Sequence, residues 1–210
     1  MTLFIYVFAA LFSVMNPLGT VPIFVGLTKD DTKAEQSKTS FLTAINIFVI
    51  LLIAFFTGKY LLNFFGISIE SLRIAGGLII VSSGFALLTG SFNKHKGMDR
   101  KKVKTDAYQR ESVSLTPLAI PMLAGPGSIS LLIGMQEQYT QLIEKTYIIA
   151  AIAVVCFATF LVLKSAHFIV KFLGASGINA ISRIIGFIVI AIGIEYISSS
   201  VMIVLKDALY

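Results

Sequence analysis

The chain alternates between long apolar stretches and short polar connections along its 210 residues. Helices of about 17 to 25 predominantly apolar residues are long enough to cross the hydrocarbon core of a bilayer. Six stretches come close to or reach this length, and they cover residues 3–28, 39–57, 69–90, 113–135, 146–163 and 179–205. The pattern predicts an all-α membrane protein in which six transmembrane helices form a single polytopic domain, residues 1–210.

The composition points the same way. Hydrophobic residues make up 56% of the chain, charged residues make up 13%, and the mean hydropathy is +0.88. A soluble domain carries about 25% charged residues, so a water-exposed surface is excluded for most of this chain. The single cysteine, Cys156, falls inside an apolar stretch and has no partner for an intramolecular disulfide. We expect it to pack as a small core residue.

The net charge of +6 is divided unevenly between the two sides that six spans define. Counted by alternate connections, one side holds thirteen Lys and Arg residues and the other holds four. Seven of the thirteen lie in the connection 91–111, which we interpret as a basic cytoplasmic linker because short cytoplasmic loops are enriched in Lys and Arg. This asymmetry places both termini outside the cytoplasm. Because the charge lies between spans, we expect contact with the lipid bilayer and no binding of nucleic acid.

The two halves of the chain resemble each other, which predicts an internal repeat with repeat 1 at 1–90 and repeat 2 at 112–210. Pro17 and Pro126 are 109 positions apart. Each half contributes three spans, an odd number, so the second half enters the membrane from the opposite face, as in the inverted repeats of many secondary transporters. Chance similarity, or a register that pairs Pro17 with Pro121, is the alternative. The matching segments are Gly66-Ile67-Ser68 with Gly177-Ile178-Asn179, and Arg73-Ile74-Ala75-Gly76 with Arg183-Ile184-Ile185-Gly186.

All five prolines lie in the first and fourth apolar stretches. Proline has no backbone N–H to donate and its ring clashes with the preceding turn, so a helix ends or kinks there. Asn16-Pro17 and Gly125-Pro126 have the form of a helix start, since Asn and Gly are accepted at the N-cap and Pro is favoured at the first helical position. We therefore expect discontinuous first and fourth helices. The alternative is that the prolines only bend them.

Two helix starts inside a membrane would form a site for a small zwitterion. The first amides of each new helix lack partners and lie at the positive end of the helix dipole, which suits a carboxylate. Each proline also leaves the carbonyl four residues earlier without its usual donor, and such carbonyls can bind an ammonium group or Na⁺. The predicted substrate-binding residues are Ser13, Asn16, Pro17, Leu18, Gly19, Thr20, Gly125, Pro126, Gly127 and Ser128.

Two further polar residues inside the spans are assigned a coupling or gating role. Glu195 is the one acidic residue well inside a span, and a carboxylate at that depth is costly unless it is protonated, paired or facing water. It could carry a coupling proton. The alternatives are a structural partner, or a shorter sixth span that places Glu195 at the interface. Asn46 is either a substrate contact or one half of an interhelical hydrogen bond.

Other small and basic residues of the spans are interpreted as scaffold. Arg73 and Arg183 lie where the third and sixth stretches begin, and we expect them to anchor at the interface by snorkelling. Small residues favour close approach of membrane helices, so we expect the third and sixth helices to pack together near the pseudo-twofold axis. The glycines that would allow this are Gly76, Gly77 and Gly84 in the third stretch, and Gly186 and Gly193 in the sixth.

The segments around the two breaks, residues 13–24 and 117–129, have the sequences SVMNPLGTVPIF and PLAIPMLAGPGSI. These paired motifs resemble those of the MarC family of bacterial and archaeal integral membrane proteins, and the resemblance covers essentially the whole chain. It implies a protein of the bacterial or archaeal cytoplasmic (inner) membrane. It also implies kinship with small neutral amino acid transporters, which move glycine, alanine and similar substrates.

The sequence thus favours a secondary transporter of small neutral amino acids, driven by an H⁺ or Na⁺ gradient. One alternative is an exporter of drugs or other small amphiphiles, with a cavity lined by some of the 17 Phe residues. Another is a noncatalytic membrane protein of a different role. The sequence contains no motif for catalysis or ATP binding, and neither His95 nor His167 has a second ligand at metal spacing. We therefore expect no enzyme activity, no metal site and no cofactor, and the sequence leaves a homo-oligomer open.

Overall fold

The computed structural model describes residues 2–89 and 114–209, and the predicted basic linker 91–111 lies outside these ranges. Every element within the described ranges is helical, which confirms the all-α prediction. In chain order the elements are α1 (Thr2–Met15), α2 (Pro17–Leu27), α3 (Lys33–Phe65), α4 (Ile69–Leu88), the π-helix η1 (Ser114–Leu123), α8 (Pro126–Gln138), α9 (Leu142–Lys164) and α10 (Ala166–Leu209).

Four of these helices are long and apolar enough to cross a membrane: α3, α4, α9 and the part Ser176–Lys206 of α10. Helices α1 and α2 together form a fifth candidate span, which is bent by 41° at the break between them. The fourth predicted stretch, 113–135, is divided between η1 and α8. The described chain is therefore a multi-pass helical membrane protein with four to five candidate spans, and the sixth span stays a prediction.

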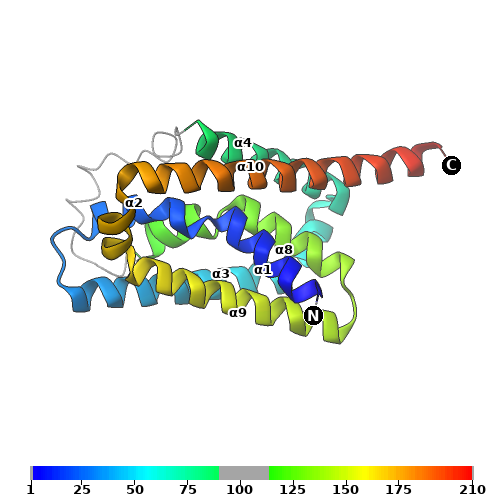
Figure 1. The fold of residues 1–210 in the computed structure, drawn as a ribbon. Helices are drawn as coiled ribbons and strands as arrows, with labels where there is room; N and C mark the ends of the chain where they lie inside the picture. The colour runs from blue at the N-terminus through cyan, green and yellow to red at the C-terminus, as the bar shows by residue number, and fades with distance from the viewer. Residues whose placement is uncertain (1, 90–113, 210) are drawn as a thin grey trace.

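Figure 1 shows the helices in three layers. Helices α4 and α10 pack along each other on one side, α3 and α9 pack on the other, and the shorter elements α1, α2, η1 and α8 lie between them. The buried apolar core lies mainly among this middle layer, α3 and α9, and it includes Leu11, Phe24, Phe55, Leu131 and Ile152. Long helices thus flank the short elements on both sides. The break at Asn16 and Pro17 is buried, whereas at the second break Gly125 is half-buried and Pro126 is exposed.

Polar caps extend the long helices beyond the apolar stretches that predicted them. Helix α3 starts at a capping box, in which the Thr32 hydroxyl accepts from the Glu35 amide (3.3 Å) and the Thr32 amide donates to the Glu35 carboxylate (2.8 Å). It ends at Gly66, whose positive φ of 65° suits a residue without a Cβ. Helix α10 is interrupted at Gly174, which also has a positive φ of 64° but an extended ψ of 174°.

The helix boundaries and contacts follow the register of the predicted repeat. Helices α2 and α8 start 109 positions apart, and so do α3 and α9. In this register η1, α8, α9 and α10 correspond to α1, α2, α3 and α4. The contact of α1 with α9 then corresponds to that of η1 with α3. The contact of α2 with α10 corresponds to that of α8 with α4. The inverted repeat itself stays a prediction.

Two glycine pairs bring α4 and α10 into backbone contact. A Cβ atom added to Gly77 would lie 2.8 Å from the Gly193 carbonyl oxygen, and one added to Gly84 would lie 2.8 Å from the Gly186 carbonyl oxygen. Position numbers rise along α4 as they fall along α10, so the two helices are antiparallel. This confirms the prediction that small residues pack the third and sixth helices together, except at Gly76, which faces Ser130 of α8 instead.

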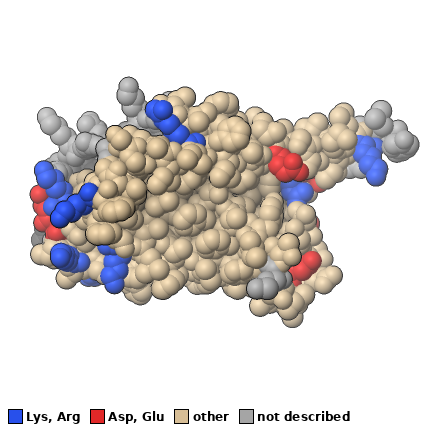
Figure 2. All heavy atoms as spheres, in the orientation of Figure 1, with Lys and Arg blue, Asp and Glu red and all other residues tan. Residues whose placement is uncertain are grey.

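The two ends of the bundle differ in charge (Figure 2). The terminal end carries both chain termini, the turn at Gly66 and the connection between α8 and α9 (Figure 1). The basic end carries the connection between α2 and α3, the end of α4 and the link between α9 and α10. Lys and Arg side chains gather visibly at the basic end in Figure 2. The described lysines in its connections and nearest helix turns are Lys29, Lys33, Lys38, Lys164 and Lys171.

Candidate functional site

The first break is formed by Asn16, which separates α1 from α2. Its backbone has φ 48° and ψ 65°, and it is the one residue other than glycine with positive φ in the part of the chain that the structure describes. Asn tolerates this left-handed conformation better than other side chains do. Asn16 is 1% exposed, and Pro17 follows at the first helical position. The Asn-Pro pair is therefore a helix start, as its sequence predicted.

Only one of the two polar atoms of the Asn16 side chain has a hydrogen-bond partner among the described residues. Its Oδ1 accepts a hydrogen bond from the Gly19 amide at 3.1 Å and so caps α2. Its Nδ2 is buried and has no hydrogen-bond partner within the described chain. A buried donor without a partner costs about 1–3 kcal/mol. An unpaired buried donor on a backbone of this rare kind is a feature that calls for an explanation.

The cap changes one sequence prediction. The Gly19 amide was expected to be an unpaired donor for a ligand, and this is wrong because Asn16 Oδ1 already accepts from it. Gly19 has a different role: a Cβ atom at this position would overlap the Asn16 side-chain amide. Glycine at position 19 thus leaves the space that the Asn16 amide occupies.

The other residues predicted for the first break lie around this cap. Pro17 and Thr20 are buried, whereas Ser13 and Leu18 are half-buried. The Thr20 hydroxyl donates to the Asn16 carbonyl at 3.3 Å. Pro17 has no N–H, so the Ser13 carbonyl lacks the donor that a continuous helix would supply. The first break therefore offers both a hydrogen-bond donor, Asn16 Nδ2, and a hydrogen-bond acceptor, the Ser13 carbonyl.

The second break lies between η1 and α8. Pro117 and Pro121 lie inside η1, where they cannot donate the usual helical bonds, and the Ala124 amide bonds the Ala119 carbonyl five residues earlier at 2.8 Å. Helix α8 then begins at Pro126 after Gly125, which provides no side-chain cap. The Ser128 hydroxyl donates to the Leu123 carbonyl at 3.1 Å, across the break. The start of α8 therefore lacks the side-chain cap that α2 has.

The two breaks meet inside the bundle. A Cβ atom at Gly127, in the first turn of α8, would lie 3.3 Å from Cγ1 of Val14, two residues before Asn16. The same atom would lie 3.0 Å from Cγ1 of Ile80 in α4. Gly127 and Ser128 are both buried. The structure thus brings together the two segments that the sequence singled out, with Val14 and Ile80 as aliphatic neighbours of the start of α8.

The two residues assigned to coupling lie elsewhere. The side-chain amide of Asn46, in α3, donates to the Ser114 hydroxyl at the start of η1 at 3.2 Å, so Asn46 makes the interhelical bond named as one of its two alternatives. Glu195 is exposed on α10, and within the described ranges no hydrogen bond or ion pair joins it to either break. A coupling role for either residue stays a prediction.

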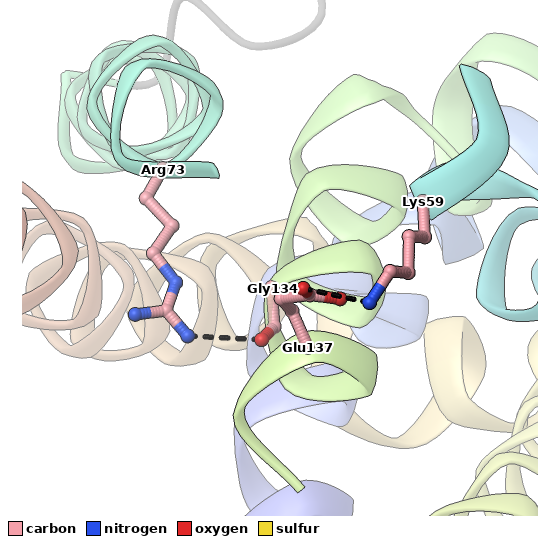
Figure 3. A network of polar contacts seen from close by, with 4 residues as sticks. All are labelled: Lys59, Arg73, Gly134 and Glu137. Atoms are coloured by element: carbon pink, nitrogen blue, oxygen red, sulfur yellow. Dashed lines mark hydrogen bonds and ion pairs between the residues drawn. The ribbon is translucent and has the colours of Figure 1, made fainter. Parts of the chain in front are cut away.

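The contacts of Arg73 differ from those that the sequence predicted. This residue was expected to snorkel to the interface, but its Nη2 donates to the Gly134 carbonyl at 2.9 Å and to Gln138 Oε1 at 3.2 Å, both on α8 (Figure 3). Its Nε is buried without a partner among the described residues. One feature of the sequence could have predicted this contact. Directly after the fourth apolar stretch, Gln136-Glu137-Gln138 offers side-chain acceptors for a residue such as Arg73. In the described ranges no three His, Cys, Asp or Glu side chains are grouped so that they could hold a metal ion.

Comparison with known proteins gives matches along nearly the whole chain. The model of the MarC family, described as MarC family integral membrane proteins, matches residues 1–205. Among the similar relatives, a UPF0056 membrane protein of Buchnera aphidicola subsp. Schizaphis graminum is 35% identical over 100% of this chain and 96% of its own. YhcE, a UPF0056 membrane protein of Escherichia coli, is 35% identical over 92% and 89% of the two chains. The UPF0056 inner membrane protein MarC of Salmonella typhimurium is 32% identical over 91% and 90%. No solved structure matches the chain.

Proposed function

Since the chain belongs to the MarC family of integral membrane proteins, we propose that it is a secondary transporter of small neutral amino acids, driven by an H⁺ or Na⁺ gradient. The observation that carries this proposal is the meeting of two interrupted helices at Gly127 and Val14, beside a buried Asn16 amide with an unpaired donor. Polar backbone at the depth of a bilayer is tolerated where it is buried in protein or lines a cavity. Interrupted helices at mid-membrane are the form that substrate sites take in many secondary transporters.

The breaks offer groups for both charges of a zwitterion. The uncapped first turn of α8, at Gly127 and Ser128, presents backbone N–H groups at the positive end of a helix dipole, where a carboxylate is stabilised. The unpaired Asn16 Nδ2 is a further donor. Carbonyls without helical donors, such as that of Ser13, are acceptors for an ammonium group. We assign the carboxylate to the donors and the ammonium group to these acceptors.

The neighbours of the α8 start favour a small substrate. Val14 and Ile80 lie 3.3 and 3.0 Å from the position that a Cβ of Gly127 would take. Aliphatic side chains this close leave room for few additional atoms and offer no partner to a charged or polar side chain. Glycine and alanine fit these limits better than larger or charged amino acids, and better than the amphiphilic compounds of the alternative exporter hypothesis.

Six spans in a 3+3 inverted repeat belong to this proposal. Its support is the set of helix contacts that exchange between the halves, and the antiparallel packing of α4 against its counterpart in α10. Two halves related by an axis in the membrane plane would place equivalent helices antiparallel. In such a fold η1 and α8 together form the fourth span, as α1 and α2 form the first. Transport would then alternate access to the breaks from the two ends of the bundle.

The proposal is tested by uptake into proteoliposomes of the purified protein. Labelled glycine or alanine should accumulate when an H⁺ or Na⁺ gradient is imposed, and accumulate less when the gradient is collapsed. The matched control is Gly26→Ala, because Gly26 lies on the exposed face of α2 with no heavy atom within 4 Å of an added Cβ. This variant should transport like the parent. Uptake no higher than that of empty liposomes for every small neutral amino acid would contradict the proposal.

A further inference from the structure

The last two turns of α8 are held by polar contacts from three long helices. Arg73 of α4 donates to the Gly134 carbonyl (2.9 Å) and to Gln138 (3.2 Å). The Tyr196 hydroxyl of α10 donates to the Leu131 carbonyl at 3.1 Å. Lys59 of α3 forms an ion pair with Glu137 at 3.0 Å. Figure 3 shows Arg73 and Lys59 reaching this turn of α8 from opposite sides.

The guanidinium of Arg73 packs closely against α8. It lies against the Gly134 carbonyl, near the C-terminal end of the helix, where the dipole is negative and a cation is stabilised. A Cβ atom at Gly134 would lie 3.1 Å from Arg73 Nε and 3.4 Å from the Tyr196 hydroxyl. Glycine at position 134 therefore lets the guanidinium and the phenol approach the same turn.

The equivalent contact is missing at the basic end. Arg183 is the repeat counterpart of Arg73, and it is exposed on α10 with no hydrogen bond to α2 among the described residues. The end of α2 is held partly by side chains of its own repeat: the Thr28 hydroxyl donates to the Phe24 carbonyl at 2.8 Å, and the Gln36 amide donates to the Thr28 carbonyl at 3.2 Å. From the other half, His167 of α10 lies with its Nε2 3.4 Å from Gln36 Nε2 and its ring edge-on to Phe24. Among the described residues, an arginine thus fastens α8 across the bundle, whereas a histidine makes the contact across the bundle at the end of α2.

We propose that Arg73 is a positioning residue, which locks α8 to α4 at the terminal end and so closes the path from that end to the helix breaks. Helix α8 has 13 residues and spans about 20 Å at about 1.5 Å per residue. Because a helix this short moves as one body, holding its last turn also holds its first turn beside Val14. Release of Arg73 lets α8 move away from α4 and opens the site toward the terminal end. The identification of the breaks as the site rests on the proposed function, but the lock itself does not depend on the substrate.

The test uses chemical access to a residue between α8 and α4, with no substrate present. Ser130 is buried, donates to the Leu72 carbonyl at 3.2 Å and lies against Gly76 of α4. In a Cys156→Ala background, which removes the one native cysteine, Ser130→Cys reports this interface through its reaction with a membrane-impermeant thiol reagent. The reagent is applied to proteoliposomes of known orientation from each side in turn.

With Arg73 present, Ser130→Cys should react slowly from both sides. Arg73→Gln should raise the rate by about tenfold or more from the terminal side alone, since hydrogen bonds to a charged group are lost. Gly134→Ala should raise the rate in the same direction but less strongly with the arginine still present, because its Cβ, 3.1 Å from Arg73 Nε, crowds the guanidinium against α8. Arg183→Gln is the matched control and should leave the rate from the terminal side unchanged.

Three results would overturn the lock. Continued protection of Ser130→Cys in both Arg73→Gln and Gly134→Ala would show that Arg73 does not close this path. Equal acceleration from both sides would show general loosening of the fold. Loss of folded protein in both variants, measured by thermal unfolding in detergent, would assign Arg73 a purely structural role. Failure of amino acid uptake with the expected access pattern intact would count against the proposed substrate and leave the lock standing.

Discussion

At the scale of single residues, Asn16 combines features that folding alone does not require. A glycine would adopt the same left-handed backbone without strain, and a serine or aspartate would cap α2 as well. Asn adds an amide nitrogen, and that nitrogen is the buried atom left without a partner. The side chain is therefore explained better by a ligand at the break than by the stability of the helix start.

This interpretation predicts different effects for two substitutions of Asn16. Asn16→Gly should change the free energy of unfolding by less than about 1 kcal/mol, since Gly accepts positive φ, is a fair N-cap and removes an unpaired buried donor. Asn16→Ala should cost roughly 2 kcal/mol or more, because Ala lacks the cap and is strained in the left-handed region. Both variants should lose amino acid uptake. Thermal unfolding in detergent and proteoliposome uptake measure the two effects, and full uptake by Asn16→Gly would place the site elsewhere.

The residues around Asn16 show how far sequence can specify a site. The Asn-Pro and Gly-Pro pairs predicted two helix starts, and both exist in the structure. The Gly19 amide was misassigned because its partner depends on the side-chain rotamer of Asn16, which no spacing determines. Arg73 was misassigned for a similar reason: its target carbonyl at Gly134 is 61 positions away and carries no side-chain signature.

At the scale of elements, the contact of α4 with α10 was the most predictable feature. Glycines spaced seven apart on each helix, Gly77 and Gly84 on one and Gly186 and Gly193 on the other, already indicated a small-residue face. The π-helix η1 was not predictable, since its hydropathy is that of any apolar span and its two internal prolines allow several backbone solutions. The extended ends of α3 were also missed, because capped polar turns add length without adding hydropathy.

The glycine contact predicts a large effect from a small substitution. In Gly84→Ala the new methyl group would lie 2.8 Å from a backbone carbonyl oxygen, which cannot turn away as a side chain can. The helices must separate, so we expect a loss of about 1–3 kcal/mol in the free energy of unfolding, as for other overpacked sites. Gly26→Ala places a methyl group in open space on α2 and should be neutral or stabilise by up to about 1 kcal/mol. Equal unfolding temperatures for the two variants would contradict this contact.

At the scale of the whole molecule, the two halves share an arrangement but differ in chemistry. The helix contacts exchange between the halves, whereas the cap at Asn16 and the arginine contact on α8 each occur in one half within the described chain. In the proposed transporter, polar contacts that differ between the two halves would let the two ends of the bundle open at different times. The matched motifs, such as Pro17 and Pro126 at an offset of 109, predict a repeat. They carry no information on the arginine contact, because that contact depends on one conformation of the protein.

The charge difference between the ends predicts the orientation of the molecule in the membrane. The basic end should face the cytoplasm, because Lys and Arg near spans are retained on that side, and both termini should lie outside. Cys156 is buried, so the parent protein should react weakly with impermeant thiol reagents. In a Cys156→Ala background, Thr140→Cys reports the exposed connection between α8 and α9, and Lys29→Cys reports the exposed connection between α2 and α3. Intact cells should label Thr140→Cys directly and Lys29→Cys only after permeabilisation. The reverse pattern would place the termini in the cytoplasm, and the arginine contact on α8 would then close the cytoplasmic path instead of the external one.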